Sequence, residues 1–256
     1  MSWATSAVFR QLVRREFTER HQGSFLGLVW LLLLPLLQLA VLAVVFGALL
    51  PARASLDVPY PAFLAIGMWP WLMMANSINR SVTAYTDNRD LIGKVAIHYQ
   101  LYVLARVTGS LIIDLSGWLL VLFALYLYGI KFSFSGLLLC IPAVVVMIIY
   151  AVSLSNIVAI LQVFVRDFAP AVVQLLTLGF FLTPILYVRS AMPAEISYYL
   201  GFNPFALLIE WIHAALLNVT KLDISSFMIS AAVATLLLLL SIWLNKRARP
   251  HIEDFL

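Results

Sequence analysis

Six long apolar segments, separated by short gaps that hold nearly every charged residue, constrain the fold of this chain more than any motif. A helix needs about 20 mostly apolar residues to cross roughly 30 Å of hydrocarbon. Unpaired backbone groups are costly in lipid, so a crossing segment is almost forced to be helical. The sequence therefore predicts an all-α membrane protein, a single transmembrane domain over 1–256, with spans at 26–50, 60–83, 101–129, 134–165, 168–188 and 226–245.

The basic residues predict how these spans are oriented. With a cytoplasmic N-terminus, 12 of the 16 Lys and Arg residues lie on or near the cytoplasmic side. This is a strong positive-inside bias, and six crossings then place both termini in the cytoplasm. Because the basic residues follow the membrane and not one surface, the formal net charge of +4 does not indicate a nucleic-acid partner.

Composition and motifs exclude several other classes of protein. With 63% hydrophobic and 11% charged residues, the chain has more apolar surface than a soluble core of this size needs. No signal peptide is visible in residues 1–24, and the single Cys140 allows no intrachain disulfide. The four histidines are isolated, without partners at ligand spacing, so we expect no metal site and no cofactor.

The N-terminal segment 1–24 is predicted to hold an amphipathic helix over 5–22 that lies in the headgroup plane. Glu16 and Arg20 fall within its apolar sector, four residues apart, and are expected to pair. Two roles remain open for this helix: a simple topology anchor at anionic headgroups, or an interface that also contacts a partner or a lipid phosphate. The candidate residues for phosphate contact are Arg10, Arg14, Arg15 and Arg20.

The gap at 86–99 is long enough for a short helix parallel to the membrane, and it contains Gly93-Lys94. A P-loop needs glycine five residues before that pair and Ser or Thr after it, where Asn88 and Val95 stand. The chain therefore has no visible nucleotide site. After the fifth span, residues 190–218 form two short apolar stretches separated by Gly201-Phe202-Asn203-Pro204, predicted to be a re-entrant hairpin in the outer leaflet. The alternative is a surface loop with interfacial helices.

Asp114 is the most expensive residue to place in a membrane, since a central Asp costs roughly 2.5–3.5 kcal/mol on insertion scales. It is expected to face the bundle interior. There it either forms a structural hydrogen bond to another span or provides a polar side chain on a transport path. Arg106, two turns away, is expected to snorkel to the cytoplasmic interface. Aromatic residues near the span ends form ordinary interfacial belts or stack on sugar rings; they are Tyr60, Phe63, Trp69, Trp71, Phe180, Phe181 and Tyr187.

Several stretches, in order and spacing, run through almost the whole chain and resemble one known family. The first is Arg20-His21-Gln22-Gly23-Ser24-Phe25-Leu26-Gly27-Leu28-Val29-Trp30 leading to Pro35; then come Asn88-Arg89-Asp90-Leu91-Ile92-Gly93-Lys94-Val95, Val165-Arg166-Asp167-Phe168, Thr183-Pro184-Ile185-Leu186-Tyr187 and Asn203-Pro204-Phe205. The chain resembles the permease subunit of bacterial ABC-type polysaccharide exporters, the O-antigen, capsule and teichoic-acid export family. It departs from the family pattern at Ile97-His98, where a Phe-Pro pair is frequent.

The resemblance implies a homodimer of six-span subunits in the bacterial inner membrane, seated on two separate ATP-binding subunits. It also implies a substrate that is a glycan on a polyprenyl diphosphate lipid, and it makes the chain a transport subunit and not an enzyme. The loop between the second and third spans would be a coupling helix on the ATPase, through Asn88, Arg89, Asp90, Leu91, Ile92 and Lys94. The first and fifth spans would line the path, and the hairpin would form an outer gate.

For that path and gate the sequence offers amide and aromatic side chains, which suit weak, repeated contacts with a long glycan. The candidates are Trp30, Gln38, Gln174, Phe180, Phe181, Tyr187, Asn203, Pro204 and Phe205. Two alternatives remain. A permease of the same superfamily that exports a drug or a small lipid has the same six-span layout. A membrane-embedded transferase would need paired acids or His at a membrane face, and none appear.

Overall fold

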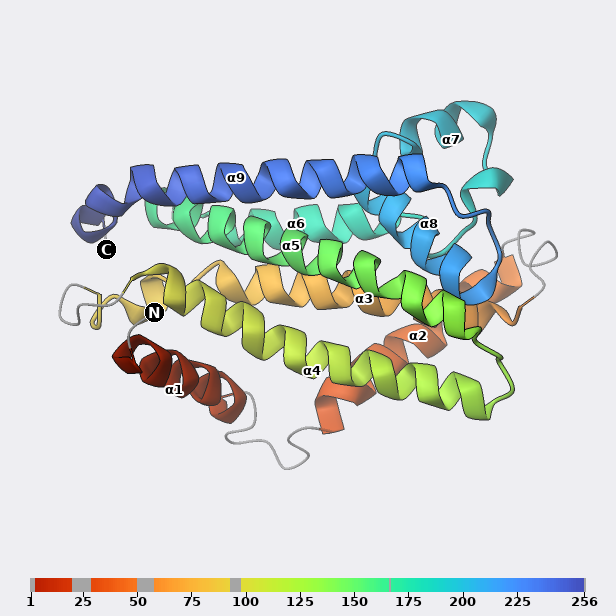
Figure 1. Ribbon diagram of the computed structural model, residues 1–256, viewed down its shortest axis with the longest axis horizontal. Helices are drawn as coiled ribbons and strands as arrows, with labels where there is room; N and C mark the ends of the chain where they lie inside the picture. The colour runs from red at the N-terminus through yellow and green to blue at the C-terminus, as the bar shows by residue number, and fades with distance from the viewer. Residues whose placement is uncertain (1–2, 20–28, 50–57, 93–97, 166, 256) are drawn as a thin grey trace.

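The computed structural model describes residues 3–19, 29–49, 58–92, 98–165 and 167–255, and every regular element in these ranges is helical. This confirms the all-α prediction for the described chain. The elements, shown in Figure 1, are α1 (Trp3–Glu19), α2 (Val29–Leu49), α3 (Tyr60–Ser81), the 3-10 helix η2 (Thr86–Asn88), α4 (Gln100–Leu127), α5 (Phe134–Phe164), α6 (Phe168–Phe181), the 3-10 helix η3 (Arg189–Ala191), α7 (Ala194–Leu200), α8 (Pro204–Leu217) and α9 (Ile224–Phe255).

The long helices run along one axis, with α3 at the centre of the bundle (Figure 1). Helix α3 packs on α4 and α5, while α5 also packs on α9 and α8. Nearly all side chains of α3 are buried, from Tyr60 to Ser81. The start of α1 and the end of α9 lie at the same end of the bundle, and α7 and α8 lie at the other (Figure 1).

Three described helices are both long and apolar enough to cross a membrane: α4, α5 and residues 224–252 of α9. A fourth is added if the bent pair α7 and α8 is one span, while α6 and residues 33–47 of α2 form shorter apolar helices. The structure therefore supports a multi-pass membrane protein, and the count of six crossings stays a prediction.

The helix in the fifth predicted span, 168–188, is shorter than the span, because α6 stops at Phe181. The residue before a proline is pushed out of the helical region, and Thr183 precedes Pro184. The side chain of Thr183 instead donates to the carbonyl of Gly179 at 2.8 Å, which closes the last turn. The 14 residues of α6 cover about 21 Å.

The helix in the last predicted span, 226–245, is longer than the span, because α9 continues to Phe255 through the basic residues Lys246, Arg247 and Arg249. Packing explains the extension: Asn245, at the predicted end, and Ala248 and Ile252, beyond it, are buried at helical spacing. At its start, Asp223 accepts hydrogen bonds from the backbone and side chain of Ser225 and from the hydroxyl of Ser226. These bonds lower the pKa of the Asp223 carboxyl to about 2, so this helix cap is ionised at neutral pH.

The segment 190–218 contains two short helices, α7 and α8, bent by 99° relative to each other, as the sequence predicts. Asn203 caps α8 by accepting a hydrogen bond from the backbone N–H of Phe205 at 3.0 Å, and Pro204 occupies the first helical position. The amide of Asn203 also donates to the carbonyl of Leu182 at 3.0 Å. Asn203 therefore joins the start of α8 to the end of α6.

We predict that Gly136→Ala destabilises the contact between α5 and α8. A Cβ at this position would lie 2.1 Å from the carbonyl oxygen of Ala215, so one backbone has to move. Overpacking of this kind costs about 1–3 kcal/mol. Thermal unfolding in detergent measures it, with Gly47→Ala as the control, since a Cβ there meets Tyr60 at an ordinary 3.4 Å. Equal unfolding temperatures for Gly136→Ala and the wild type would contradict the packing.

A second prediction separates the two roles of Asn203. Asn203→Ala removes both the cap and the link to α6, at about 1 kcal/mol for the cap and about 0.5–1.5 kcal/mol for the link. Asn203→Asp keeps an acceptor for the Phe205 N–H but has no amide to donate to Leu182. Thermal unfolding should rank wild type above Asn203→Asp and Asn203→Ala lowest. A protein unaffected by Asn203→Ala would show that neither bond matters.

Candidate functional site: a polar groove and a charged cluster

A groove of about 270 Å³ opens between α2, α3 and α6. It combines amide, hydroxyl and aromatic side chains with aliphatic ones, although all three helices come from apolar segments of the sequence. Its lining residues are Gln38, Leu42, Trp71, Leu72, Ala75, Asn76, Asn79, Val173, Leu176, Thr177, Phe180 and Phe181.

The polar part of the groove comes from all three helices. Gln38 stands on α2, Asn76 and Asn79 on α3, and Thr177 on α6. Residues three apart share one face of a helix, which brings Asn76 and Asn79 to the same side of α3. Polar side chains are costly to place in lipid, so in membrane helices they mostly face the protein interior or a water-filled cavity, where they can mark a substrate pathway. The groove is therefore the candidate transport site.

Asp114 of α4 lies next to this groove through Asn76. The amide nitrogen of Asn76 is 3.3 Å from each carboxylate oxygen of Asp114. This is a hydrogen bond to another predicted span, one of the two roles that the sequence left open for Asp114. Asn76 thus faces Asp114 with its nitrogen and borders the groove as well.

Aromatic rings form part of the lining of the groove. Trp71 makes edge contacts with Phe180 and Phe205, at ring-centre distances of 6.5 and 5.8 Å, and Phe180 meets Phe181 at 5.4 Å. Trp71 lies close against α6 because Gly179 has no side chain, and a Cβ there would be 2.8 Å from the indole ring. Helices α3, α6 and α8 therefore meet in one aromatic contact.

The structure brings some of the predicted path residues together and leaves others apart. Gln38, Phe180 and Phe181 line the groove, as the list above gives. The remaining gate candidates do not line the groove. Pro204 and Phe205 start α8, and Asn203 caps that helix. Phe205 contacts Trp71, and the hydroxyl of Tyr187 donates to the Phe181 carbonyl at 3.1 Å. Trp30 and Gln174 are exposed on α2 and α6 and do not border the groove.

Sequence reasoning missed Asn76, Asn79 and Thr177 as lining residues. A signal was present for the two asparagines, because both are polar, three residues apart, in the predicted second span. Nothing in the sequence distinguishes Thr177 from a threonine that only bonds its own helix, as its hydroxyl does to the Val173 carbonyl at 2.9 Å.

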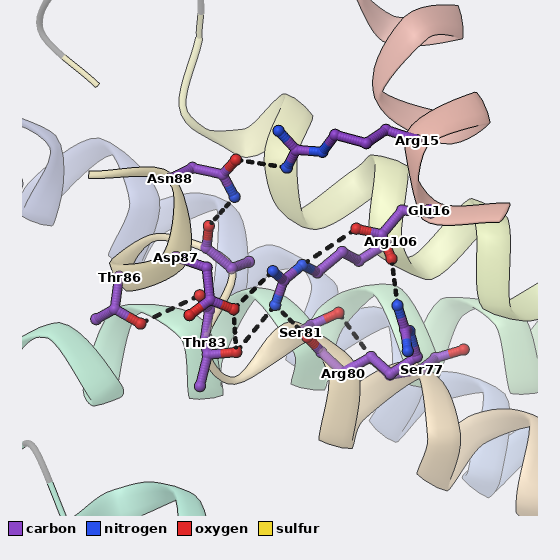
Figure 2. A network of polar contacts seen from close by, with 11 residues as sticks. Arg15, Glu16, Ser77, Arg80, Ser81, Thr83, Thr86, Asp87, Asn88 and Arg106 are labelled. Atoms are coloured by element: carbon purple, nitrogen blue, oxygen red, sulfur yellow. Dashed lines mark hydrogen bonds and ion pairs between the residues drawn. The ribbon is translucent and has the colours of Figure 1, made fainter. Parts of the chain in front are cut away.

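A cluster of charged side chains, in which Glu16 and Arg106 are buried, forms the second part of the site, at the end of the bundle where α1 lies (Figures 1 and 2). Glu16 of α1, with a side chain only 3% exposed, lies between two arginines. One carboxylate oxygen is 2.6 Å from Nη2 of Arg80, and the other is 3.3 Å from Nε of Arg106. Arg106 also forms an ion pair with Asp87 at 2.7 Å. We call Glu16, Arg80, Asp87 and Arg106 the charged cluster.

One expectation from the sequence is changed here and another stays a prediction. Glu16 pairs with Arg80 and Arg106, on α3 and α4, and its pairing with Arg20 is not tested, because Arg20 lies outside the described residues. Arg106 does not extend to the interface; its side chain is 10% exposed, and one of its nitrogens donates to the Arg80 carbonyl at 2.6 Å and to Thr83 Oγ1 at 3.0 Å. Buried charges need several partners, and long-range packing supplies them.

The arginines predicted to contact lipid phosphate have different surroundings. Arg10 and Arg14 are exposed on α1, and Arg20 lies outside the described residues. Arg15 donates to the side-chain oxygen of Asn88 at 2.6 Å, as Figure 2 shows, so this side chain points into the protein.

The segment 86–99 begins with η2 and continues as turns to Ile92, and Lys94 lies outside the described residues. Asn88 and Ile92 are buried, while Arg89, Asp90 and Leu91 are exposed. The described part of the predicted coupling helix is thus a short 3-10 helix followed by turns, and three of its five described candidate residues are exposed. Among the described residues, no group of three or more His, Cys, Asp or Glu side chains could hold a metal ion.

Comparison with known proteins identifies the family. Residues 7–217 match the model of the ABC-2 type transporter family. The chain is 30% identical over 233 residues to the O-antigen export system permease protein RfbA of Myxococcus xanthus, covering 89% of this chain and 86% of that protein. It is 26% identical to the protein of the same name from Klebsiella pneumoniae (78% and 76% covered) and 24% identical to the polysialic acid transport protein KpsM of Escherichia coli (78% and 77% covered). With more than half of its length matched by that model, the chain belongs to the ABC-2 type transporter family.

Proposed function

We propose that this chain is the membrane permease subunit of an ATP-driven exporter that carries a polysaccharide, linked to polyprenyl diphosphate, across the bacterial inner membrane. Membership of the ABC-2 type transporter family and the names of the relatives, O-antigen export permease and polysialic acid transport protein, support a polysaccharide substrate. The observation that carries the proposal is the groove between α2, α3 and α6.

The chemistry of the groove suits a sugar chain. Amides such as Asn79 and Gln38 offer both donors and acceptors to hydroxyl groups, and aromatic rings such as Trp71 and Phe181 pack on the C–H faces of sugars. None of these four side chains carries a charge, so no single contact holds the polymer strongly. A transport path needs such weak, repeated binding, because tight binding would trap the substrate.

At 270 Å³, the groove of one chain is small for a polymer. We therefore propose that two copies of the chain face each other and that the first and fifth predicted spans, here α2 and α6, line the common path. Both helices carry large exposed apolar side chains, including Leu37 and Leu175, that a second copy or lipid would cover.

We further propose that two separate ATPase subunits bind at the end of the bundle where α1 begins and α9 ends, which would be the cytoplasmic side. The exposed residues Arg89, Asp90 and Leu91 are the docking surface. The diphosphate of the lipid carrier would first meet Arg10 and Arg14, which are exposed on α1 and suited to phosphate. Export of a drug or a small lipid is the second candidate, and the two relatives named for glycan transport favour the polysaccharide.

Filling the groove tests the transport path. In Asn79→Trp the indole occupies the space beside Asn76, and we expect export to fall by about tenfold or more, equivalent to about 1.4 kcal/mol in the barrier. Surface glycan is measured in cells whose own permease is deleted and which carry this chain with its ATPase partner. Leu239→Trp introduces the same residue at an exposed position of α9 and should export normally. Normal export by Asn79→Trp would exclude the groove, and export without the ATPase would contradict the proposed function.

Reversing a charge tests the docking surface. Asp90→Arg should leave membrane insertion intact, since Asp90 is exposed, but weaken co-purification of the ATPase and reduce export by about tenfold. Lys221→Glu, an exposed charge reversal near the opposite end of the bundle, serves as the control. Unchanged ATPase binding and export in Asp90→Arg would remove the docking assignment.

A further inference from the structure

We infer that Glu16 is a positioning residue that fastens α1 to the segment 83–92, so that the two move as one body when the ATPase subunits act. This inference rests on the proposed function, since it assigns a mechanical role to the element behind the proposed docking surface. It is carried by the charged cluster and by two further contacts of α1.

The guanidinium of Arg106 joins two elements that are far apart in the sequence, α1 and η2. Arg106 of α4 has Asp87 on one side, at 2.7 Å, and Glu16 on the other, at 3.3 Å. Its remaining contacts, to the Arg80 carbonyl and to Thr83, hold the plane of the guanidinium in place. Because a planar fork with several fixed partners has little freedom, a displacement of Asp87 is passed to Glu16.

The contact of Glu16 with its two arginines is hard to break. The side chain of Glu16 is 3% exposed and that of Arg106 is 10% exposed, whereas that of Asp87 is 52% exposed. Separating Glu16 from its arginines would leave a buried carboxylate without a counter-charge, which is strongly unfavourable. The outer pair with Asp87 is partly screened by solvent and is the weaker of the two. The contact that is harder to break therefore lies on the α1 side of Arg106.

Further contacts hold α1 against α4 and against the segment 83–92. A Cβ on Gly109 of α4 would lie only 3.1 Å from Cβ of Glu16, so this glycine permits the close approach of the two helices. Arg15, the neighbour of Glu16, donates to Asn88, which in turn donates to the Ala84 carbonyl at 2.8 Å. Of two consecutive residues of α1, Arg15 thus contacts the turn directly and Glu16 contacts it through Arg106.

Helix α1 therefore has one face that contacts the rest of the protein and another that is exposed. Arg15 contacts the segment 83–92 and Glu16 contacts Arg106, which holds that segment, while Arg10 and Arg14 are exposed. Motion of the loop would therefore move the exposed arginines of α1 relative to the membrane surface. This links the proposed ATPase contact to the proposed contact with the lipid carrier.

The test uses the full complex of the permease with its ATPase subunits, reconstituted in vesicles, and compares ATP hydrolysis with export. Glu16→Gln keeps the shape of the side chain and removes the charge. We expect assembly and ATP hydrolysis to persist while the glycan exported per ATP falls about tenfold. Gln11→Ala, at an exposed position of the same helix, should leave both quantities unchanged. A proportional loss of hydrolysis and export in Glu16→Gln would overturn the inference.

Two further measurements separate a link from a merely structural residue. If Arg106 relays motion, Glu16→Gln and Asp87→Asn interrupt the same path, so the double variant should be no worse than the poorer single variant. Losses that multiply would overturn the inference. Hydrogen exchange should rise together in α1 and in 83–92 in Glu16→Gln, and a rise confined to α1 would also overturn it.

If Glu16→Gln does not assemble with the ATPase subunits, a milder variant provides the test. Arg80→Gln removes one partner of Glu16 and leaves Arg106 in place, so export per ATP should fall by a smaller factor. An unchanged ratio in Arg80→Gln overturns the inference. If the proposed function itself is wrong, the wild-type complex will show no ATP-dependent export. The hydrogen-exchange comparison does not depend on export, so it tests the inference separately.

Discussion

Polar groups that are packed among apolar helices must find their partners inside the protein, and this constraint shapes each part of the structure. Arg106 can be buried only because Glu16, Asp87 and two backbone or hydroxyl oxygens surround it. The same requirement places Asn76 opposite Asp114. Each such pair joins two different helices, so satisfying the polar groups also fixes how the helices lie against one another.

Local signals predicted the individual helices well. Hydrophobic length located α2, α3, α4 and α5 to within a few residues, and Asn203-Pro204 located the start of α8. The helices differ from the predicted spans at the ends of α6 and α9, where length and polarity were used alone. At α6 the backbone restriction before Pro184 decides the end of the helix, and at α9 the packing of Ala248 and Ile252 extends it past the polar residues.

Partners between helices could not be predicted in the same way. The sequence placed Arg20 beside Glu16 because only residues on the same helix can be compared by spacing. The actual partners, Arg80 and Arg106, are 64 and 90 positions away in the chain. For the groove, Gln38 and two phenylalanines were predicted from their residue types, but the face that Asn79 and Thr177 share with them depends on how α2, α3 and α6 pack.

The shortness of α6 has a consequence for the surrounding lipid. Its 14 residues span about 21 Å, whereas the hydrocarbon of a bilayer is roughly 30 Å thick. Lipid beside a helix that is too short thins locally, at a modest cost for each ångström of mismatch. Because α6 also forms one wall of the groove, the membrane would be thinnest beside the proposed path, and a charged headgroup moving there would cross less hydrocarbon than elsewhere.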